Sequence, residues 1–288
     1  MTRRHSAGTN GRPASGAARR RAPGTGRSLT VLKVGGSLLE ASETDDSALD
    51  QAAAAWRAGE EILLVHGGGN ELSRWLERLG LESRFVDGQR VTTPEALQVA
   101  IMVLGGLVNR RLVEGLVRRG CPAVGLTGAD GAGTLAAPVI DRSLGAVGEV
   151  VSVNAPFFRD LLAARRVPVV ASLSWSPAHG FLNVNADLMA AALAAGLGAR
   201  RLLLMTEVAG VQGGDGTTIP RVTLRDIARL LREGTAHDGM IPKLRACRAA
   251  LEAQVPEVMI LGPSGGVLDR VLRGTAPGEG TRVVWAAP

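Results

Sequence analysis

The chain of 288 residues contains no tyrosine, and aromatic side chains make up only 3% of it. Because modules that bind single-stranded nucleic acid stack bases on aromatic side chains, this scarcity argues against such a module. Cysteine is equally rare, with only Cys121 and Cys247. Two isolated cysteines are too few for a disulfide framework or a zinc site, so each is expected to be a small buried side chain.

Long apolar runs and targeting signals are also missing from the sequence. No stretch approaches the roughly 20 apolar residues that span a bilayer, and no signal-peptide pattern follows the basic start. The sequence therefore predicts a soluble, cytoplasmic protein without a membrane partner.

Lysine is almost absent, since the 33 basic side chains include only Lys33 and Lys243 and all the others are arginine. An ammonium is a compact point charge, whereas a guanidinium is a wide planar fork. Both lysines stand beside glycines, in Lys33-Val-Gly-Gly-Ser and Gly-Met-Ile-Pro-Lys243. We interpret them as positions that require a compact ammonium at a phosphate-handling site; the alternative is chance survival on the surface.

The net charge of +6 comes from the N-terminal segment, where residues 1–27 hold seven arginines and no acidic residue. The rest of the chain has 26 basic and 27 acidic side chains and is close to neutral. Residues 1–28, rich in Arg, Gly and Pro, are predicted to be a disordered tail. An inert extension is favoured over a targeting segment or a nucleic-acid arm, and a start site near Leu29 or Val31 is a further alternative.

Short apolar strands alternate with amphipathic helices from residue 29 onward. Strands are predicted over 28–34, 61–65, 123–126, 167–171, 201–205, 258–261 and 282–285, helices over 47–57, 71–79, 94–118, 186–197 and 238–254, and hairpins over 85–91 and 133–153. Strand, glycine turn and helix in succession are typical of βαβ units, which bind ligands at the strand C-termini. The pattern predicts a three-layer α/β/α sandwich with a central, mostly parallel sheet.

Two glycine loops, Gly35-Gly36 and Gly67-Gly68-Gly69, each follow a predicted strand. Their backbone N–H groups can close around anionic oxygens at a helix N-terminus. A Walker A motif is excluded because valine follows Lys33 and leucine follows Lys243. No Gly-x-Ser-x-Gly elbow occurs, and the first loop lacks the dinucleotide fingerprint. Phosphate chemistry without a P-loop remains.

Asn183, Asn185 and Asp187 alternate, so in an extended segment they would point to one side. Asp187 begins a helix so apolar that it must be buried, and a buried carboxylate needs a partner. One interpretation is a helix N-cap by Asn185 or Asp187. The other is that Asp187 orients the two lysines, and the two interpretations are compatible.

Six segments carry a family resemblance, in the family's order: Lys33-Val-Gly-Gly-Ser, Val65-His-Gly-Gly-Gly, Val86-Asp-Gly-Gln-Arg-Val-Thr92, Ala123-Val-Gly-Leu-Thr-Gly-Ala-Asp-Gly131, Asn183-Val-Asn-Ala-Asp187 and Asp238-Gly-Met-Ile-Pro-Lys243. On these the chain resembles the amino-acid kinase superfamily and, within it, the acetylglutamate kinases, over about residues 29–286. Carbamate kinases, uridylate kinases and aspartokinases share the glycine loops, but not the third and fifth segments together.

The resemblance implies a role for each matching residue. Lys33 and Lys243 would flank the transferred phosphoryl group, and Asp187 would hold both ammoniums. Backbone N–H groups of Gly35, Gly36, Gly67 and Gly68 would donate to the γ-phosphate and to the side-chain carboxylate of the substrate. Arg90 would bind the substrate α-carboxylate through two hydrogen bonds, and Asn183 would contact the substrate backbone. Residues 207–212 and 235–237 would border the nucleotide, and the nucleotide-binding residues expected in or beside these segments are Glu207, Gly210, His237 and Gly239.

The implied reaction is ATP-dependent phosphorylation of the γ-carboxylate of N-acetyl-L-glutamate, the second step of arginine biosynthesis. Magnesium would arrive with ATP, and no dedicated metal site is expected. The alternatives are a kinase of N-succinylglutamate or of a carrier-bound amino acid, and a non-catalytic sensor on the same fold. The N-terminal lobe would span about 29–180 and the nucleotide lobe about 181–288.

The resemblance also bears on assembly and regulation. Arginine-inhibited members use an N-terminal amphipathic helix to form hexamers, and the Gly/Pro-rich tail cannot form one, so a homodimer without arginine feedback is expected. Two positions depart from the family pattern: Glu207 stands where aspartate is usual, and Ala129 where many members carry lysine.

Overall fold

The computed structural model describes residues 27–35, 48–86, 88–139, 141–233, 239–262, 265–276 and 278–286. Most of the predicted tail, residues 1–26, therefore lies outside the described residues. The strands are β1 (Leu29–Val34), β2 (Glu61–His66), β3 (Phe85–Val86), β4 (Gln89–Arg90), β5 (Ala123–Leu126), β6 (Thr134–Pro138), β7 (Val147–Val153), β8 (Val167–Ala171), β9 (Leu173–Ser176), β10 (Gly180–Val184), β11 (Arg201–Met205), β12 (Arg221–Thr223), β13 (Glu257–Leu261) and β14 (Thr281–Val284). The helices are α2 (Ala48–Arg57), α3 (Gly69–Arg78), α4 (Pro94–Ala100), η1 (Ile101–Val108), α5 (Asn109–Arg118), η2 (Asp130–Ala132), η3 (Arg142–Leu144), α6 (Ala155–Ala163), α7 (Ala186–Leu197), α8 (Leu224–Arg232), α9 (Met240–Glu252) and α10 (Val267–Leu272).

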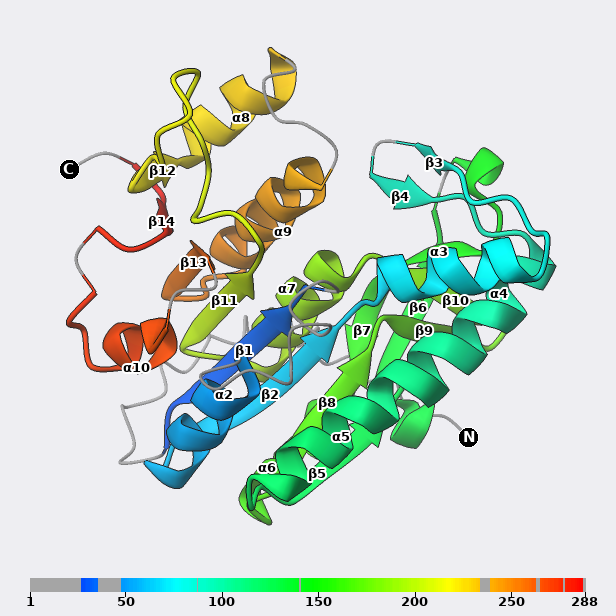
Figure 1. Cartoon of the computed structure of the whole chain (residues 1–288), viewed down its shortest axis with the longest axis horizontal. Coiled ribbons are helices and arrows are strands. Elements are labelled where there is room, and N and C mark those ends of the chain that lie inside the picture. Colours follow the sequence, from blue (N-terminus) through cyan, green and yellow to red (C-terminus); the bar gives the residue numbers. More distant parts are fainter. Residues whose placement is uncertain are drawn as a thin grey trace, which may run out of the picture.

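An eight-stranded sheet forms the centre of the molecule, in the order β12-β14-β13-β11-β1-β2-β8-β5 (Figure 1). Neighbouring strands from β13 to β5 are parallel, and β14 runs antiparallel to β13. Strand β1 lies between β11 and β2, with Lys33 in register with Leu204 and Val65. The predicted mostly parallel sheet is confirmed.

Helices cover both faces of this sheet, because successive side chains of a buried strand alternate between the two sides. Val31 of β1 packs in the core shared with α7 and α9, whereas Leu32 and Val34 pack in the core shared with α2, η1, α5 and α10. Lys33, two residues after Val31, faces the α7 side. The three-layer arrangement is confirmed.

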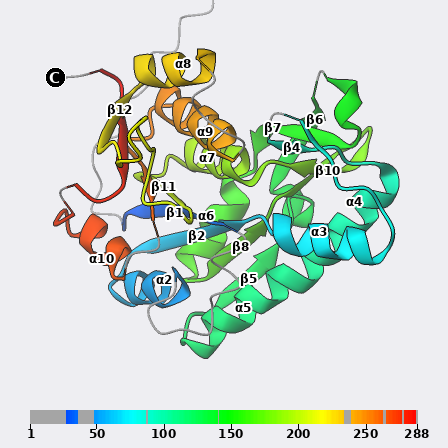
Figure 2. The same cartoon turned by 45° about the horizontal axis from the view of Figure 1, so that its top comes forward.

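A second, smaller group of strands lies beside the main sheet. The predicted hairpin over 133–153 is present as the antiparallel pair β6 and β7, and the short hairpin over 85–91 as β3 and β4. Strands β10, β7, β6 and β9 close into a small four-stranded barrel, which the sequence did not predict. This barrel and the β4 strand lie at one end of the molecule, with β12 and α8 at the other (Figure 2).

The long helix predicted over 94–118 is present, but its central segment is not an α-helix. Thr93 caps its start by accepting a hydrogen bond from the Ala96 N–H at 3.2 Å. The eight residues of η1 are π-helical, between α4 and α5. By length and composition alone, this is the one helix in the described part of the chain that could cross a membrane, and the core helix of a soluble protein passes the same test. It contributes Val103, Leu104 and Val108 to the core.

Candidate active site

The two lysines of the chain meet at one carboxylate. Lys33 Nζ lies 2.9 Å from Asp187 Oδ1, and Lys243 Nζ lies 3.5 Å from Asp187 Oδ2. The side chains of Lys33, Asp187 and Lys243 are 8%, 6% and 11% exposed. Residues more than 200 positions apart in the sequence thus form a buried cluster with a net positive charge.

Asp187 is held in the first turn of α7. Asn185 caps this helix, because its Oδ1 accepts hydrogen bonds from the N–H groups of Asp187 at 2.9 Å and Leu188 at 3.2 Å. The N-cap interpretation is confirmed for Asn185. Asn183, Asn185 and Asp187, which alternate in the sequence, all line one cavity, although the chain turns from strand to helix at Asn185. A carboxylate in the first turn also interacts favourably with the helix dipole.

Lys243 belongs to the first turn of α9 and donates a hydrogen bond to the Gly239 carbonyl at 3.0 Å. Burial lowers its pKa, the nearby charge of Lys33 lowers it further, and the carboxylate of Asp187 opposes both effects. The carboxylate therefore helps to keep a desolvated ammonium charged.

A cavity of about 170 Å³ opens beside this cluster. The predicted site residues that line it are Lys33, Gly67, Gly68, Arg90, Asn183 and Asp187. Leu104 and Val147 add apolar surface to the same cavity. Residues assigned from the sequence to the phosphoryl group and to the acidic substrate thus lie around one space.

Arg90 is a buried guanidinium held by neutral groups. Its Nη2 donates to the Gly69 carbonyl at 2.9 Å and to Ser73 Oγ at 2.8 Å, its Nη1 donates to Ser83 Oγ, and it stacks on the Phe85 ring. Burial lowers the pKa of Arg90 to about 10, so it stays charged at neutral pH. No carboxylate among the described residues pairs with it, which leaves its charge available to an acidic ligand.

Asn183 is tied to the Arg90 segment through Thr92. Its Nδ2 donates to Thr92 Oγ1 at 3.0 Å, and that hydroxyl donates to the Arg90 carbonyl at 2.9 Å. Sequence reasoning gave Thr92 no role beyond its motif. It also missed Ser172, a buried residue that lines the cavity directly after β8. A polar residue just past a buried strand is the signal that could have identified Ser172.

The second glycine loop approaches the cavity closely. Gly68 has φ of +134°, and a Cβ there would lie 2.9 Å from Leu104 Cδ2 and 3.2 Å from Val108 Cγ2. Only glycine takes this conformation without strain. A Cβ at Gly67 would lie 3.5 Å from the Cβ of Ala186, so this loop packs against the start of α7.

The predicted nucleotide-side residues follow other strand ends. Gly35 comes directly after β1, beside the Met205 carbonyl of β11, and Glu207 follows β11. A Cβ at Gly210 would lie 2.6 Å from Thr281 Oγ1. Gly239 contacts Lys243 through its carbonyl, whereas Gly36 and His237 lie outside the described residues.

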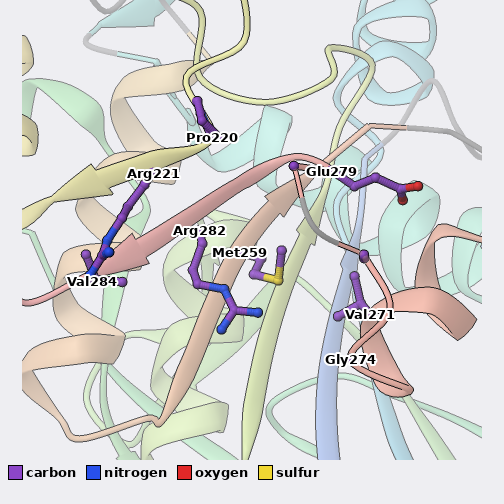
Figure 3. Close-up of a pocket in the computed structure, with 10 residues that line it drawn as sticks. Pro220, Arg221, Met259, Val271, Gly274, Glu279, Arg282 and Val284 are labelled. Carbon is purple, nitrogen blue, oxygen red and sulfur yellow. The ribbon is translucent and has the colours of Figure 1, made fainter. Parts of the chain in front are cut away.

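A second cavity, of about 540 Å³, lies between β12, β13, β14 and α10 (Figure 3). Met259 and Val271 form apolar parts of its wall, and the charged residues Arg221, Glu279 and Arg282 also line it. Of the predicted site residues that the structure describes, none lines this cavity.

Fold and site together match one class of proteins. Residues 28–262 match the model of the amino acid kinase family, and the chain belongs to this family. Two similar curated proteins carry the name acetylglutamate kinase. That of Solibacter usitatus is 41% identical over 257 residues, which cover 89% of this chain and 99% of the relative. That of Geobacillus sp. strain WCH70 is 42% identical over 231 residues, covering 80% and 89%.

A solved structure gives the same result for the fold. The N-acetylglutamate synthase of Neisseria gonorrhoeae, complexed with coenzyme A and N-acetyl-glutamate, matches with a TM-score of 0.76 and 25% identity. The match covers 91% of this chain and 60% of the synthase. The fold and the family predicted from the sequence are both confirmed.

Proposed function

We propose that this chain transfers the γ-phosphoryl group of ATP to the γ-carboxylate of N-acetyl-L-glutamate, giving N-acetyl-L-glutamyl 5-phosphate and ADP. This reaction is the second step of arginine biosynthesis. The name of the relatives supports the substrate, and family membership supports ATP. The observation that carries the proposal is the Lys33–Asp187–Lys243 cluster beside a cavity that also holds Arg90.

The charges of the site suit a reaction between two anions. Two ammoniums and one guanidinium, less the carboxylate of Asp187, leave an excess of positive charge around the cavity. Bringing a carboxylate to a triphosphate is opposed by repulsion, and preorganised cations offset it at low reorganisation cost.

The chemical step needs no general base. A γ-carboxylate oxygen of the substrate attacks the γ-phosphorus of ATP, the bond to the β,γ-bridging oxygen breaks, and its electron pair stays on ADP. No proton is transferred, because a carboxylate is already a nucleophile. Lys33 and Lys243 neutralise the oxygens of the phosphoryl group in flight, and Asp187 holds both ammoniums in place.

Arg90 binds the α-carboxylate of the substrate in this proposal, and Asn183 contacts the substrate backbone. The guanidinium is ordered by stacking on Phe85 and by neutral acceptors, so little conformational entropy is lost on binding. Gly67 and Gly68 donate backbone N–H groups to the reacting carboxylate.

On the nucleotide side we assign Gly35, Gly36, Glu207, Gly210, His237 and Gly239. The described members follow the carboxyl ends of β1 and β11 or precede α9, where parallel sheets bind ligands. Among the described residues, no group of three His, Cys, Asp or Glu side chains could hold a metal ion. Mg²⁺ would be held by phosphate oxygens and water. Residues 29–180 would form the acyl-amino-acid lobe and 181–288 the nucleotide lobe.

We further propose a cytoplasmic homodimer without arginine feedback. Met102 of η1 is 59% exposed, and its neighbours Ile101, Gly105, Gly106 and Leu107 are half-buried, which gives the long helix an apolar outer face. The sensor alternative gives no reason for two lysines on one carboxylate. A nucleic-acid role would involve only the tail.

A coupled assay of ADP release, or hydroxamate trapping of the acyl phosphate, tests the activity. N-acetyl-L-glutamate is expected to support turnover with far higher kcat/KM than N-succinyl-L-glutamate or free glutamate. Preference for the succinyl compound would instead establish the alternative kinase, and the absence of ADP release with all three would refute kinase activity on these substrates.

A further inference from the structure

We infer that His66 is a positioning residue, which fixes the peptide between Gly67 and Gly68 so that the Gly68 N–H faces the cavity. It acts through a chain of hydrogen bonds formed by Arg110, Asn109 and His66, here named the histidine network, in which His66 and Asn109 are buried and Arg110 is exposed. The inference rests on the proposed function in one respect, namely that the Gly68 N–H contacts the reacting anions.

His66 ends β2 and is completely buried. Its Nδ1 lies 2.8 Å from the Gly67 carbonyl oxygen, and its Nε2 lies 3.0 Å from Asn109 Nδ2. A carbonyl oxygen only accepts, so Nδ1 carries the proton. In a neutral imidazole the other nitrogen then accepts, which fits the amide donor of Asn109. One tautomer of His66 satisfies both contacts.

Asn109 fixes that tautomer from the other side. It is completely buried at the start of α5, and its Nδ2 also donates to the Val169 carbonyl at 2.9 Å. Its Oδ1 accepts a hydrogen bond from Arg110 Nη2 at 2.6 Å. A guanidinium only donates and a carbonyl only accepts, so the amide of Asn109 has one orientation that satisfies every partner. The donors in the histidine network all point from Arg110 toward Gly67.

Gly125 of β5 and the π-helical segment η1 allow the histidine network to form. A side chain at Gly125 of β5 would collide with Asn109 Oδ1 and with the Arg110 guanidinium. The π-helical segment η1 ends immediately before Asn109. It places Leu104 on the cavity and Asn109 on His66 within one continuous helix. Long π-helical segments are rare and often lie at functional sites.

Because the peptide between Gly67 and Gly68 is planar, the contact of His66 with the Gly67 carbonyl also sets the direction of the Gly68 N–H at the cavity. The C=O of Gly67 and the N–H of Gly68 belong to one planar unit and point in opposite directions. His66 holds the carbonyl toward the α5 side of the sheet, so the N–H points toward the side of Lys33. Gly68 is the N-cap of α3 and lines the cavity. Its N–H has no acceptor among the described residues, as expected for a helix start.

Two substitutions at His66 separate positioning from general packing. In His66→Asn the amide nitrogen falls near the position of Nδ1 and can still donate to Gly67. In His66→Gln the amide reaches the position of Nε2 and that donor is lost. We expect kcat of His66→Asn to stay within about fivefold of the wild type, and that of His66→Gln to fall about 10- to 100-fold with a smaller change in KM, as for loss of a preorganised donor.

Glu257→Gln serves as a control at the start of β13, three strands away from β2 in the sheet. It weakens the ion pairs of Glu257 with Arg201 at 2.9 Å and Arg282 at 3.0 Å, so its melting temperature is expected to fall while kcat stays unchanged. Equal kcat losses in His66→Asn and His66→Gln would overturn the inference, because a merely structural histidine would not distinguish them.

Nuclear magnetic resonance gives a readout that is independent of turnover. The ring nitrogens of wild-type His66 are expected to show the Nδ1–H tautomer, and the Gly68 amide signal to move in His66→Gln but not in His66→Asn. An Nε2–H tautomer, or a Gly68 signal unaffected by either change, would overturn the inference. If the wild type phosphorylates no glutamate derivative, the proposed function fails, and these spectra still decide the histidine network.

Discussion

Acidification should destabilise this protein through His66 specifically. Burial lowers the pKa of His66 from 6.5 to about 4, the charge of Arg110 lowers it too, and the hydrogen bond to Gly67 opposes both. The unfolded chain therefore binds more protons than the folded chain between about pH 4 and pH 6.5. By linkage, the free energy of unfolding falls as the pH is lowered through this window.

The size of the effect follows from the two pKa values. A fall from 6.5 to about 4, at about 1.36 kcal/mol per pKa unit, corresponds to about 3 kcal/mol when the window has been crossed. Between pH 7 and pH 5 the loss is about 2 kcal/mol, because the folded-state ring stays largely neutral there. The hydrogen bonds of His66 explain why its pKa is lowered. A proton on Nε2 would face the N–H₂ group of Asn109, and turning that amide would break its contact with Arg110.

Urea unfolding of the wild type and of His66→Asn, followed by tryptophan fluorescence from pH 5 to pH 8, measures this contribution. Subtracting the two pH profiles removes the contributions of other titrating groups. The wild type is expected to lose about 2 kcal/mol more than the variant between pH 7 and pH 5. Parallel profiles within about 0.5 kcal/mol would show that His66 is not held neutral, and the hydrogen-bond assignment would be wrong.

Four further predictions concern the site and the assembly. Lys243→Arg should lower kcat about 10²- to 10³-fold in the coupled ADP assay, and near-normal turnover would contradict the requirement for a compact ammonium. Asp187→Asn should destabilise the fold by about 3–5 kcal/mol in urea, because two buried ammoniums lose their counter-charge, and unchanged stability would show that solvent already screens them. Arg90→Lys should raise the KM for N-acetyl-L-glutamate about 10-fold or more with little change in the KM for ATP, since one ammonium cannot both replace the contacts to Gly69, Ser73 and Ser83 and bind the substrate; equal effects on both would misplace Arg90. Light scattering should give the mass of a dimer, and a hexamer would contradict the interpretation of the tail.

Much of the fold could be predicted because most of its strands and helices follow from local patterns of apolar and polar residues. Strands β1, β2, β5, β8 and β11 are apolar runs that end in glycine or polar residues, and α7 and α9 have clear starts. The small barrel was not predictable, because it depends on long-range pairing. Its closure brings Leu135 of β6 opposite Trp175 of β9, and no local feature of either segment specifies that partner. The π-helical η1 was missed because an unbroken apolar run has no periodicity that would distinguish it from an α-helix.

Some residues of the candidate site could likewise be predicted from the sequence, and others could not. Lys33, Asp187, Arg90 and Asn183 belong to motifs of contiguous residues, so the resemblance named them before the structure brought them together. Asn109 carries no such signal. It lies in an apolar helix, and its partner His66 is 43 positions away in the sequence. A buried polar pair of this kind is visible only once both helix and strand are placed.

The contacts of Asp187 suggest a physical reason why positions 33 and 243 are lysine in a chain otherwise rich in arginine. Arginine can take both oxygens of a carboxylate, as Arg119 does with Asp50 through Nε at 2.6 Å and through Nη2 at 3.0 Å. A guanidinium at position 33 or 243 that bound Asp187 in the same bidentate way would occupy both of its oxygens. Two ammoniums instead share the carboxylate, one on each oxygen, and each keeps donors for a phosphoryl group. Two arginines can also share a carboxylate, as Arg201 and Arg282 do on Glu257, so what lysine adds at Asp187 is a compact ammonium whose remaining donors face the phosphoryl group.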